Sequence, residues 1–342
     1  QFGRIKTYDN ETLSESYEYL GNNFGFPSQQ AFLGYQGYVI DPFDEIDLNN
    51  LYRSNSNPQK QAVDHDFFVS NSGYNSKHSF NISGQFKEKL YLGINLNSHY
   101  TEFKRIDRLT EFNYGSSSDF ISTLFENDLN SIGSGFSFQI GAIYKLEYFR
   151  VGLSYQSPVW YNLTDELFQY LETSKINGID IVDPRVINIY EYNLKTPSIL
   201  SVGLARVFGS KGLITLQYDY TDFTNLKFNV GDGDRNFINQ NNTIERSLKS
   251  VGTLKLGGEY RLGRLSFRTG YHNQQSINKK INDKNQGFSF GLGYDLGGSL
   301  LNLGILNQKI ERAELMYQEG LNQTINLKNL QTQYCIGLTI KL

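Results

Sequence analysis

Residues 134–160 alternate between apolar and polar side chains with almost no interruption: SGFSFQIGAIYKLEYFRVGLSYQSPVW. Phe136, Phe138 and Ile140 take one parity, whereas Ser137 and Gln139 take the other. A period of two places successive side chains on opposite faces of a β-strand, so this stretch predicts two strands, each with one apolar and one polar face. The question is whether the apolar face meets a protein core or lipid.

The same alternation recurs through residues 77–342 and predicts eleven strands. Their polar parity is mostly Gly, Ser, Thr, Asn and Gln, whereas the solvent face of a soluble sandwich is usually richer in Lys and Glu. A polar lumen and aromatic residues near strand ends are typical of transmembrane barrels. We therefore predict an all-β fold, a transmembrane antiparallel β-barrel of the outer membrane. The residues predicted to face lipid include Phe136, Ile140, Leu153, Leu216, Phe290 and Leu338.

The lengths of the connections between these strands support the same fold. Short breaks are predicted at 87–89, 145–147, 209–212, 261–264 and 295–299. Long segments lie between them, at 103–131, 161–190, 229–249, 273–286 and 309–329. Short and long connections alternate strictly, as periplasmic turns and extracellular loops do in an outer-membrane barrel. A sandwich has no reason to sort its connections this way.

Composition excludes several other classes of protein. The net charge of -3 gives no broad basic field, so no nucleic-acid partner is expected. Cys335 is the only cysteine and the four histidines are scattered, so no disulfide and no metal site are predicted. No run approaches the roughly 18 apolar residues of a membrane-spanning helix. No hydrolase constellation appears, so we expect neither an enzyme nor a cofactor.

The ordered series of strands resembles the FadL/TodX (OMPP1) family of outer-membrane transporters for long-chain fatty acids and other hydrophobic compounds. The resemblance is carried by "SGFSFQIGAIYKLEYFRVGLSYQSPV", "FNISGQFKEKLYLGINLNSHYTEFKR" and "YNLKTPSILSVGLARVFGSKGLITLQYDYTDF". "GTLKLGGEYRLGRLSFRTGYHN", "GFSFGLGYDLGG" and the terminal "IGLTIKL" complete it. The resemblance implies a fourteen-stranded barrel in which residues 77–87 form the fourth strand.

Residues 1–76 show neither the N-terminal hatch nor the kinked third strand that the family resemblance implies. They are rich in Asn, Gln and Ser, so we expect a long extracellular loop region, with the hatch and three strands lying upstream of this sequence. The stretch "AFLGYQGYVI" (31–40) is an alternative, because as a strand it would close a twelve-stranded barrel.

Two of the long connections predict amphipathic helices. In 116–130 a Ser-rich start with Asp119 can cap a helix, and in 163–172 Thr164 can cap another. We expect their apolar faces to form a hydrophobic ligand-binding groove, or alternatively to pack on the barrel rim. The resemblance also implies docking of hydrophobic ligand at the third and fourth extracellular loops. The groove residues are Phe120, Ile121, Leu124, Phe125, Leu167, Phe168, Tyr170 and Leu171.

A fatty acid also carries a carboxylate, which needs a cationic partner where water is scarce. Parity places Arg150, Lys255 and Arg268 toward the lumen, with Arg246 and Lys249 near the outer end of their strand. These five are the carboxylate-binding candidates. Lys255 and Arg268 can equally form a structural ion-pair cluster with Glu259.

We therefore predict a transporter for hydrophobic small molecules such as long-chain fatty acids, surrounded by outer-membrane lipid and working by loop capture and diffusion. One alternative is a non-transporting barrel that serves as a subunit or adaptor with outer-membrane protein partners. The other is a general porin, which should line its constriction with opposed charges.

Overall fold

The computed structural model describes residues 5, 12–43, 51–229, 235–280, 283–315 and 324–340. The chain divides into two compact units. Unit 1 comprises Gln1–Ser76, Tyr100–Gly133 and Leu163–Glu191, and unit 2 comprises Lys77–His99, Ser134–Asn162 and Tyr192–Leu342. Several long strands therefore contribute residues to both units.

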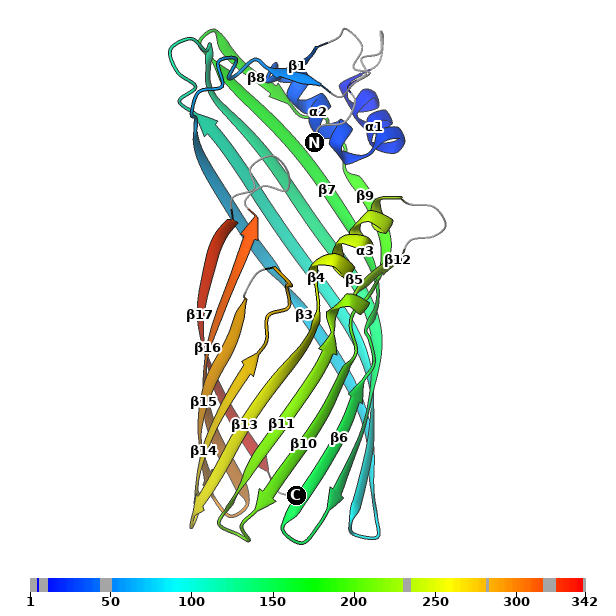
Figure 1. Ribbon diagram of the computed structural model, residues 1–342, viewed down its shortest axis with the longest axis vertical. Helices are drawn as coiled ribbons and strands as arrows, with labels where there is room; N and C mark the ends of the chain where they lie inside the picture. Colours follow the sequence, from blue (N-terminus) through cyan, green and yellow to red (C-terminus); the bar gives the residue numbers. More distant parts are fainter. Residues whose placement is uncertain are drawn as a thin grey trace. The chain divides into compact units, whose positions relative to one another are not determined.

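Strands dominate the described residues (Figure 1). The helices are α1 (Leu13–Phe24), α2 (Phe26–Gln36) and α3 (Arg235–Ser247), with a 3-10 turn η1 (Phe223–Asn225). The strands up to the middle of the chain are β1 (Ile40–Pro42), β2 (Tyr52–Ser54), β3 (Asp64–Phe86), β4 (Leu90–Phe112), β5 (Phe120–Lys145), β6 (Phe149–Gln156), β7 (Trp160–Lys175), β8 (Gly178–Val182) and β9 (Asn188–Lys195). The remaining strands are β10 (Ile199–Val207), β11 (Gly212–Asp222), β12 (Lys227–Asn229), β13 (Ser250–Leu262), β14 (Leu265–Gln274), β15 (Lys284–Asp295), β16 (Ser299–Leu315) and β17 (Thr324–Ile340).

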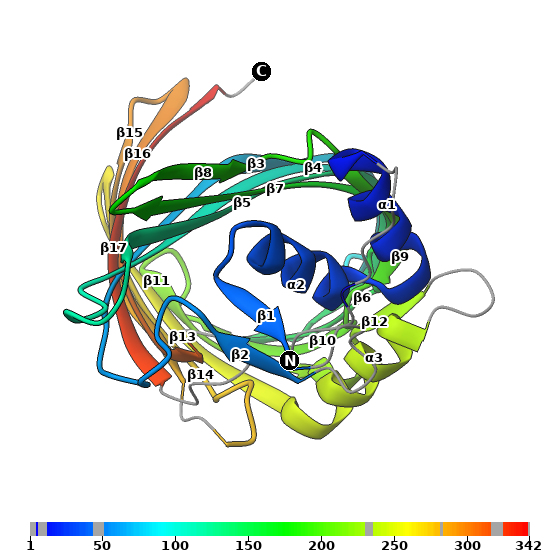
Figure 2. The same cartoon turned by 90° about the horizontal axis from the view of Figure 1, so that it is seen from above.

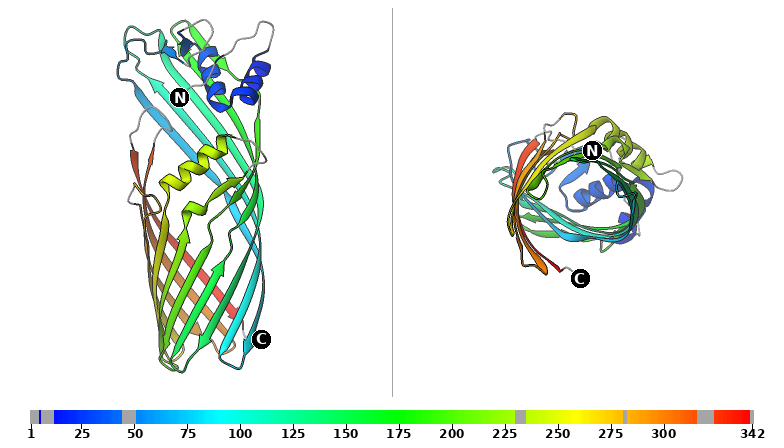
Figure 3. Two further views of the ribbon diagram at one scale, coloured as in Figure 1. Left: turned by 45° about the vertical axis from the view of Figure 1, so that its right-hand side comes forward. Right: turned by 90° about the horizontal axis from the view of Figure 1, so that it is seen from below.

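All strands except the β1–β2 pair belong to one sheet. From β10 onward it is an antiparallel meander, in which β10, β11, β13, β14, β15, β16 and β17 pair in order; Figure 3 shows these strands curving side by side. Among the described residues β3 pairs only with β4 and β17 only with β16. The sheet is therefore not closed in the part of the chain that is described, and the fourteen-stranded barrel stays a prediction.

The short turns predicted from the sequence are confirmed. Residues 87–89 connect β3 to β4, 146–148 connect β5 to β6, and 296–298 connect β15 to β16. The connections 208–211 and 263–264 complete the set. Each of them joins two strands that pair as sequential antiparallel neighbours, and Figure 1 shows them together at the lower end of the sheet.

The two loop helices predicted from the sequence are wrong. Residues 120–130 belong to β5 and residues 163–172 to β7, so most of the expected loops 103–131 and 161–190 is strand. The sequence LFQYL at 167–171 fits a helical period as well as a period of two, because both faces of β7 are partly apolar here. Buried Gln169, Leu171 and Thr173 follow the strand period.

Residues 1–76 are not the uniform loop that composition suggested. Thr12 caps α1 through its side chain, which accepts from the Glu15 backbone, while Glu15 Oε2 accepts from the Thr12 N–H. Gly25, with φ 79°, ends α1 and starts α2. The alternative strand at 31–40 is wrong as well, because residues 31–36 lie in α2 and Ile40 opens β1.

The core of unit 1 lies between the two helices and nearby strands. Figure 2 shows α1 and α2 side by side. Tyr17, Leu20, Phe32 and Leu33 are fully buried, and Leu171 of β7 belongs to the same cluster. Unit 1 thus has an apolar core of its own, with large side chains inside.

Candidate functional site

Unit 2 places its apolar side chains on the outside. Leu216, between Thr215 and Gln217 on β11, pairs with Leu256 of β13, so apolar residues on neighbouring strands share one face. The six residues predicted to face lipid are between 42% and 63% exposed. The opposite face carries the polar parity and is the candidate inner surface.

Four amides form a continuous row across this polar face. Asn81 Nδ2 donates to Asn95 Oδ1 (2.6 Å), and Asn95 Nδ2 donates to Gln139 Oε1 (3.0 Å). Gln139 Nε2 then donates to Gln156 Oε1 (2.8 Å). These residues lie on β3, β4, β5 and β6, so the row crosses four strands. A bonded, neutral row of this kind offers polarity without a net charge.

A second polar cluster lies one layer along the same strands. Ser79 Oγ donates to Asn97 Oδ1 (2.7 Å), and Asn97 Nδ2 donates to Ser137 Oγ (3.2 Å). His99 Nε2 lies 2.8 Å from the same Ser137 oxygen. Asn97 and Ser137 are almost fully buried, so these contacts satisfy polar groups that water does not reach.

Two ion pairs lie on the polar face, between neighbouring strands of the sheet. Lys255 Nζ lies 2.7 Å from Asp219 Oδ2, and Gln217 Nε2 donates to Asp219 Oδ1. Arg268 Nε lies 2.6 Å from Glu259 Oε2, and its Nη1 donates to Asn302 Oδ1 (2.7 Å). Of the ion-pair cluster that the sequence left open, the Arg268–Glu259 pair is present, whereas Lys255 pairs with Asp219 instead of Glu259.

Two glycines explain how Arg268 reaches Asn302. Arg268 is on β14 and Asn302 on β16, so the guanidinium must cross β15. A Cβ at Gly293 would lie 3.3 Å from Arg268 Nη2 and 3.1 Å from Asn302 Oδ1, and one at Gly291 would lie 3.4 Å from Arg268 Cβ. Because glycine has no side chain, these two positions leave room for the Arg268 side chain to pass over β15.

The other three carboxylate-binding candidates do not join one site. Arg150 lies at the start of β6, beside the short turn 146–148. Arg246 lies in the last turn of α3, and Lys249 lies between α3 and β13, at the opposite end of the strands. Arg246 lines a polar depression with Thr224, Asn242, Glu245 and Lys279, and Lys279 Nζ donates to the Glu245 carbonyl oxygen (2.7 Å).

The eight predicted groove residues all lie in unit 1, but some belong to its core and others are partly or fully exposed. Leu171 is buried in the core cluster and Phe125 packs against it. Phe120 lies beside the ring of Tyr114, with a centroid separation of 6.1 Å, and the Tyr170 hydroxyl donates to Glu172 Oε2. Ile121 is exposed, whereas Leu124, Leu167 and Phe168 are half-buried. They do not share one helical face, because strand alternation sends neighbours to opposite sides.

Two polar networks of unit 1 were missed by the sequence analysis. The Tyr17 hydroxyl donates to Gln169 Oε1 (2.6 Å) and accepts from Asn188 Nδ2 (3.2 Å), and burial raises the pKa of Tyr17. Gln169 Nε2 donates to Asn127 Oδ1 (2.8 Å). The sequence signal was the T-x-x-E capping box at Thr12, which marks α1 and therefore the position of Tyr17.

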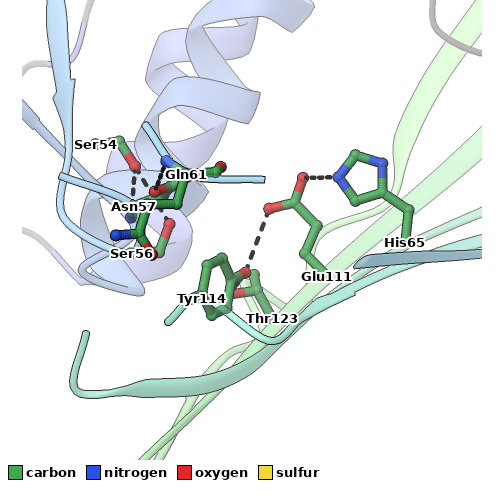
Figure 4. A network of polar contacts seen from close by, with 8 residues as sticks. All are labelled: Ser54, Ser56, Asn57, Gln61, His65, Glu111, Tyr114 and Thr123. Atoms are coloured by element: carbon green, nitrogen blue, oxygen red, sulfur yellow. Dashed lines mark hydrogen bonds and ion pairs between the residues drawn. The ribbon is translucent and has the colours of Figure 1, made fainter. Parts of the chain in front are cut away.

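The second network anchors residues 54–61 and the connection from β4 to β5 (Figure 4). The Tyr114 hydroxyl lies 2.8 Å from Thr123 Oγ1 and 3.3 Å from Glu111 Oε2, and His65 Nε2 faces Glu111 Oε1 at 3.3 Å. Asn57 Nδ2 donates to the Gln61 carbonyl oxygen. These contacts order backbone and contain no nucleophile paired with a base.

An exposed apolar surface was also missed. Within residues 176–189, five isoleucines are each between 56% and 67% exposed. They are Ile176, Ile179, Ile181, Ile187 and Ile189. Ile179 and Ile181 share one face of β8 because they are two residues apart. We call these five residues the isoleucine patch.

The described residues contain neither a membrane-spanning helix nor a group of metal ligands. None of the described helices has the length and apolar character needed to cross a membrane. No group of three or more His, Cys, Asp or Glu side chains that could hold a metal ion occurs in the described ranges.

Comparison with known proteins agrees with the geometry. A family described as "Outer membrane protein transport protein (OMPP1/FadL/TodX)" matches residues 49–299. No curated protein matches the sequence at a significant level. Among solved structures, the CymD monoaromatic hydrocarbon channel has a TM-score of 0.51 at 15% identity, covering 81% of this chain and 78% of CymD. This likeness concerns the fold alone.

Two toluene transporters are also similar. TbuX of Ralstonia pickettii has a TM-score of 0.44 at 13% identity, covering 71% of this chain and 63% of TbuX. TodX of Pseudomonas putida has a TM-score of 0.43 at 12% identity, covering 82% of this chain and 87% of TodX. Because the family match spans most of the sequence, the chain belongs to the OMPP1/FadL/TodX family of outer-membrane transport proteins of Gram-negative bacteria.

Proposed function

We propose that this protein takes up hydrophobic small molecules, such as long-chain fatty acids, across the outer membrane by surface capture and diffusion. The family match over residues 49–299 is the observation that carries this proposal. The polar face of unit 2 is consistent with it, because Lys255 and Arg268 are paired within the sheet and the amides of the row are bonded to one another. The uptake requires no cofactor.

The capture step would use apolar side chains of unit 1. Phe120, Leu124, Phe168 and Tyr170 are half-buried, so part of each side chain can still meet a ligand. Burying an apolar side chain of this size against a ligand is worth roughly 1.5–3 kcal/mol. Leu171 and Phe125 support these strands from the core and would not touch the ligand.

The carboxylate of a fatty acid would bind at Arg246. Lys255 and Arg268 already neutralise Asp219 and Glu259. Arg246 has no ion pair among the described residues, and Lys279 lines the same depression. Two cations beside an open polar depression suit a carboxylate better than a cation whose partner is already in place.

Aromatic hydrocarbons are the other class of hydrophobic ligand to consider, because CymD and TodX are named for monoaromatic hydrocarbons and toluene. These compounds lack a carboxylate, so the contribution of Arg246 separates the two classes.

We also propose that further strands close the sheet between β3 and β17. Each of these strands has a single neighbour among the described residues. An unpaired strand edge in lipid leaves backbone groups unsatisfied, each at a cost of several kcal/mol. The predicted boundaries, with a barrel over 77–342 and an extracellular region over 1–76, belong to this proposal.

The proposal is tested by uptake into a Gram-negative host that lacks its own fatty-acid channel. We expect the protein to raise uptake of radiolabelled oleate, and Arg246→Gln to lower it severalfold while toluene uptake stays unchanged. Lys280→Gln, which removes a neighbouring exposed lysine, is the matched control. Serine at Phe120, Leu124, Phe168 and Tyr170 should lower uptake of both compounds at least tenfold.

Control substitutions to serine at Leu146, Tyr148 and Leu296, exposed residues of the short turns, should leave uptake unchanged. Passage of sucrose without any gain in oleate or toluene uptake would contradict the proposal and favour a general porin.

A second candidate function rests on the isoleucine patch. An exposed apolar surface on a sheet edge also suits an outer-membrane protein partner, as expected for an adaptor. If the protein is an adaptor, the parent should co-purify with one partner in a fixed ratio from native membranes and should not take up oleate. The double variant Ile179→Ser/Ile181→Ser should lose this partner.

A further inference from the structure

Three lysines surround one glutamate on the outward face of β15, β16 and β17. Lys284 of β15 lies directly opposite Glu311 of β16, and Glu311 lies directly opposite Lys328 of β17. Lys309 is two residues from Glu311 on the same face, and its Nζ lies 2.5 Å from Glu311 Oε1. Lys284 and Lys328 also interact electrostatically with Glu311. We call Lys284, Lys309 and Lys328 the lysine triad.

The triad shares its face with the apolar surface of unit 2. Lys284 has the parity of Phe288 and Phe290, which are 53% and 63% exposed. Lys309 has the parity of Leu303 and Ile305 on β16. The lysines therefore point toward the membrane side of the sheet and not toward its polar face.

The height of the triad above the apolar surface matches the headgroup layer. Lys284 lies four residues beyond Phe288, or about 14 Å along the strand at about 3.4 Å per residue. With the usual barrel tilt of about 40°, this is about 10 Å along the membrane normal. On β15 the residue of this face between Phe288 and Lys284 is Gln286, which lies opposite Lys309 of β16, and Lys309 lies opposite Leu330 of β17.

This end of the strands is the extracellular one. The connections between β14 and β15 and between β16 and β17 are long, whereas the turn 296–298 at the other end is short. Short turns mark the periplasmic side of outer-membrane barrels. The triad therefore lies at the level of the outer leaflet.

The charge balance leaves the cluster cationic. Three lysines and one glutamate carry a formal net charge of +2. Lys284 and Lys328 are exposed, and Glu311, which lies between them, forms its ion pair with Lys309. By contrast, the outward cation Arg206 at the periplasmic end lies over the rings of Phe149 and Phe208, at 5.7 and 5.1 Å, and stands alone.

We propose that the lysine triad binds the phosphate of a phosphorylated lipid of the outer leaflet, whose acyl chains lie against Phe288, Phe290 and Ile305. Phosphate oxygens accept charge-assisted hydrogen bonds from ammonium groups, and clustered lysines at headgroup depth recognise anionic lipids. The site is independent of what the protein transports. It would fix the height of β15, β16 and β17 in the membrane.

The test titrates the purified protein with bisphosphorylated lipid A and with its dephosphorylated form, which has the same acyl chains. Bound lipid is counted by native mass spectrometry. We expect the phosphorylated form to bind at least tenfold more tightly, and the difference to shrink as salt is raised. The variant Lys284→Gln/Lys309→Gln/Lys328→Gln should lose this preference, and the corresponding triple Lys→Arg variant should keep it.

The matched control is Lys87→Gln/Lys89→Gln/Lys211→Gln, which removes the same charge from exposed residues of the short turns and should bind like the parent. Heat-modifiable migration on gels reports assembly of each variant. If the triple Gln variant does not assemble, Lys284→Gln and Lys328→Gln alone, both at exposed positions, carry the test with a severalfold loss each. Equal binding of the two lipids, an unchanged Kd in the Gln variants, or equally tight binding of inorganic phosphate alone would overturn the proposal.

Discussion

Phenylalanine and leucine occupy opposite environments in the two units. Phe32 and Leu33 of unit 1 are 1% and 0% exposed, whereas Phe290 and Leu216 of unit 2 are 63% and 42% exposed. The contrast even runs along one strand, since Phe125 of β5 packs against the unit 1 core and Ile140 of the same strand is 47% exposed. What changes along β5 is therefore the burial of its apolar side chains, while the strand continues through both units.

The polar residues show the complementary pattern. In unit 2 the polar residues Ser137 and Asn97 are buried and bond to one another. In unit 1 a polar network is also buried, but a closed apolar core surrounds it. A buried apolar core and a sheet with an exposed apolar face thus occur within one chain, and we expect different mutations to destabilise them.

The largest expected effect is the loss of a core ring. Phe32→Ala should destabilise unit 1 by about 3–5 kcal/mol, because it leaves a cavity among α1, α2 and β7. Phe290→Ala should be milder, because lipid can fill the space. Hydrogen exchange of α1 and α2, compared in both variants, measures this. Equal loss of protection by both variants would break the contrast between the units.

The sequence predicted unit 2 better than unit 1 for a physical reason. In "SGFSFQIGAIYK" one face meets polar partners and the other is exposed, so the alternation is clean. In β7, Leu171 packs into the core cluster with residues of α1 and α2, while Phe168 and Tyr170 are half-buried on the other face. Apolar residues therefore occur at both parities of this strand. The order of the strands could be predicted from the short turns. The ion-pair partners of Lys255 and Arg268 could not, because they depend on the register between neighbouring strands.

The second prediction places a charge on the outward face of each unit. Leu216→Arg should destabilise the sheet of unit 2 by about 2–4 kcal/mol, because a cation near the bilayer midplane is poorly solvated. Ile179→Arg in unit 1 should change stability by less than about 0.5 kcal/mol, because Ile179 is 62% exposed. Guanidinium unfolding in phospholipid vesicles measures the first, and limited proteolysis the second. A tolerated Leu216→Arg would show that this face is not in lipid.

The third prediction removes one hydroxyl from the unit 1 network. Tyr17→Phe keeps the ring but leaves Gln169 Oε1 buried without its donor, which should destabilise unit 1 by about 2 kcal/mol. Tyr19→Phe, at a partly exposed position on the same helix, is the control. Exchange of the α1 amides should accelerate only in the first variant.

The smallest effect is an alkaline dependence confined to unit 1. Burial raises the pKa of Tyr17 above its ordinary value near 10, so its stabilising contribution is complete below pH 10 and is lost as the pH rises further. At pH 11 the loss should be roughly 1 kcal/mol, since one pKa unit is worth on the order of that much. Tyr17→Phe should remove this part of the dependence, as followed by helical circular dichroism. A parent protein with the same pH profile as the variant would contradict the assignment.

The most direct test of the account measures which face of unit 2 meets lipid. Spin labels are placed singly at Phe136, Ile140, Leu153, Leu216, Phe290 and Leu338, and at Ser137, Ser154 and Gln217 of the opposite parity. In liposomes the first set should collide with oxygen, which concentrates in lipid, and be shielded from a water-soluble nickel reagent. Labels of the second set should not show this lipid signature. The reverse pattern, or equal exposure of both sets to the nickel reagent, would contradict the lipid-facing assignment and with it the transmembrane sheet.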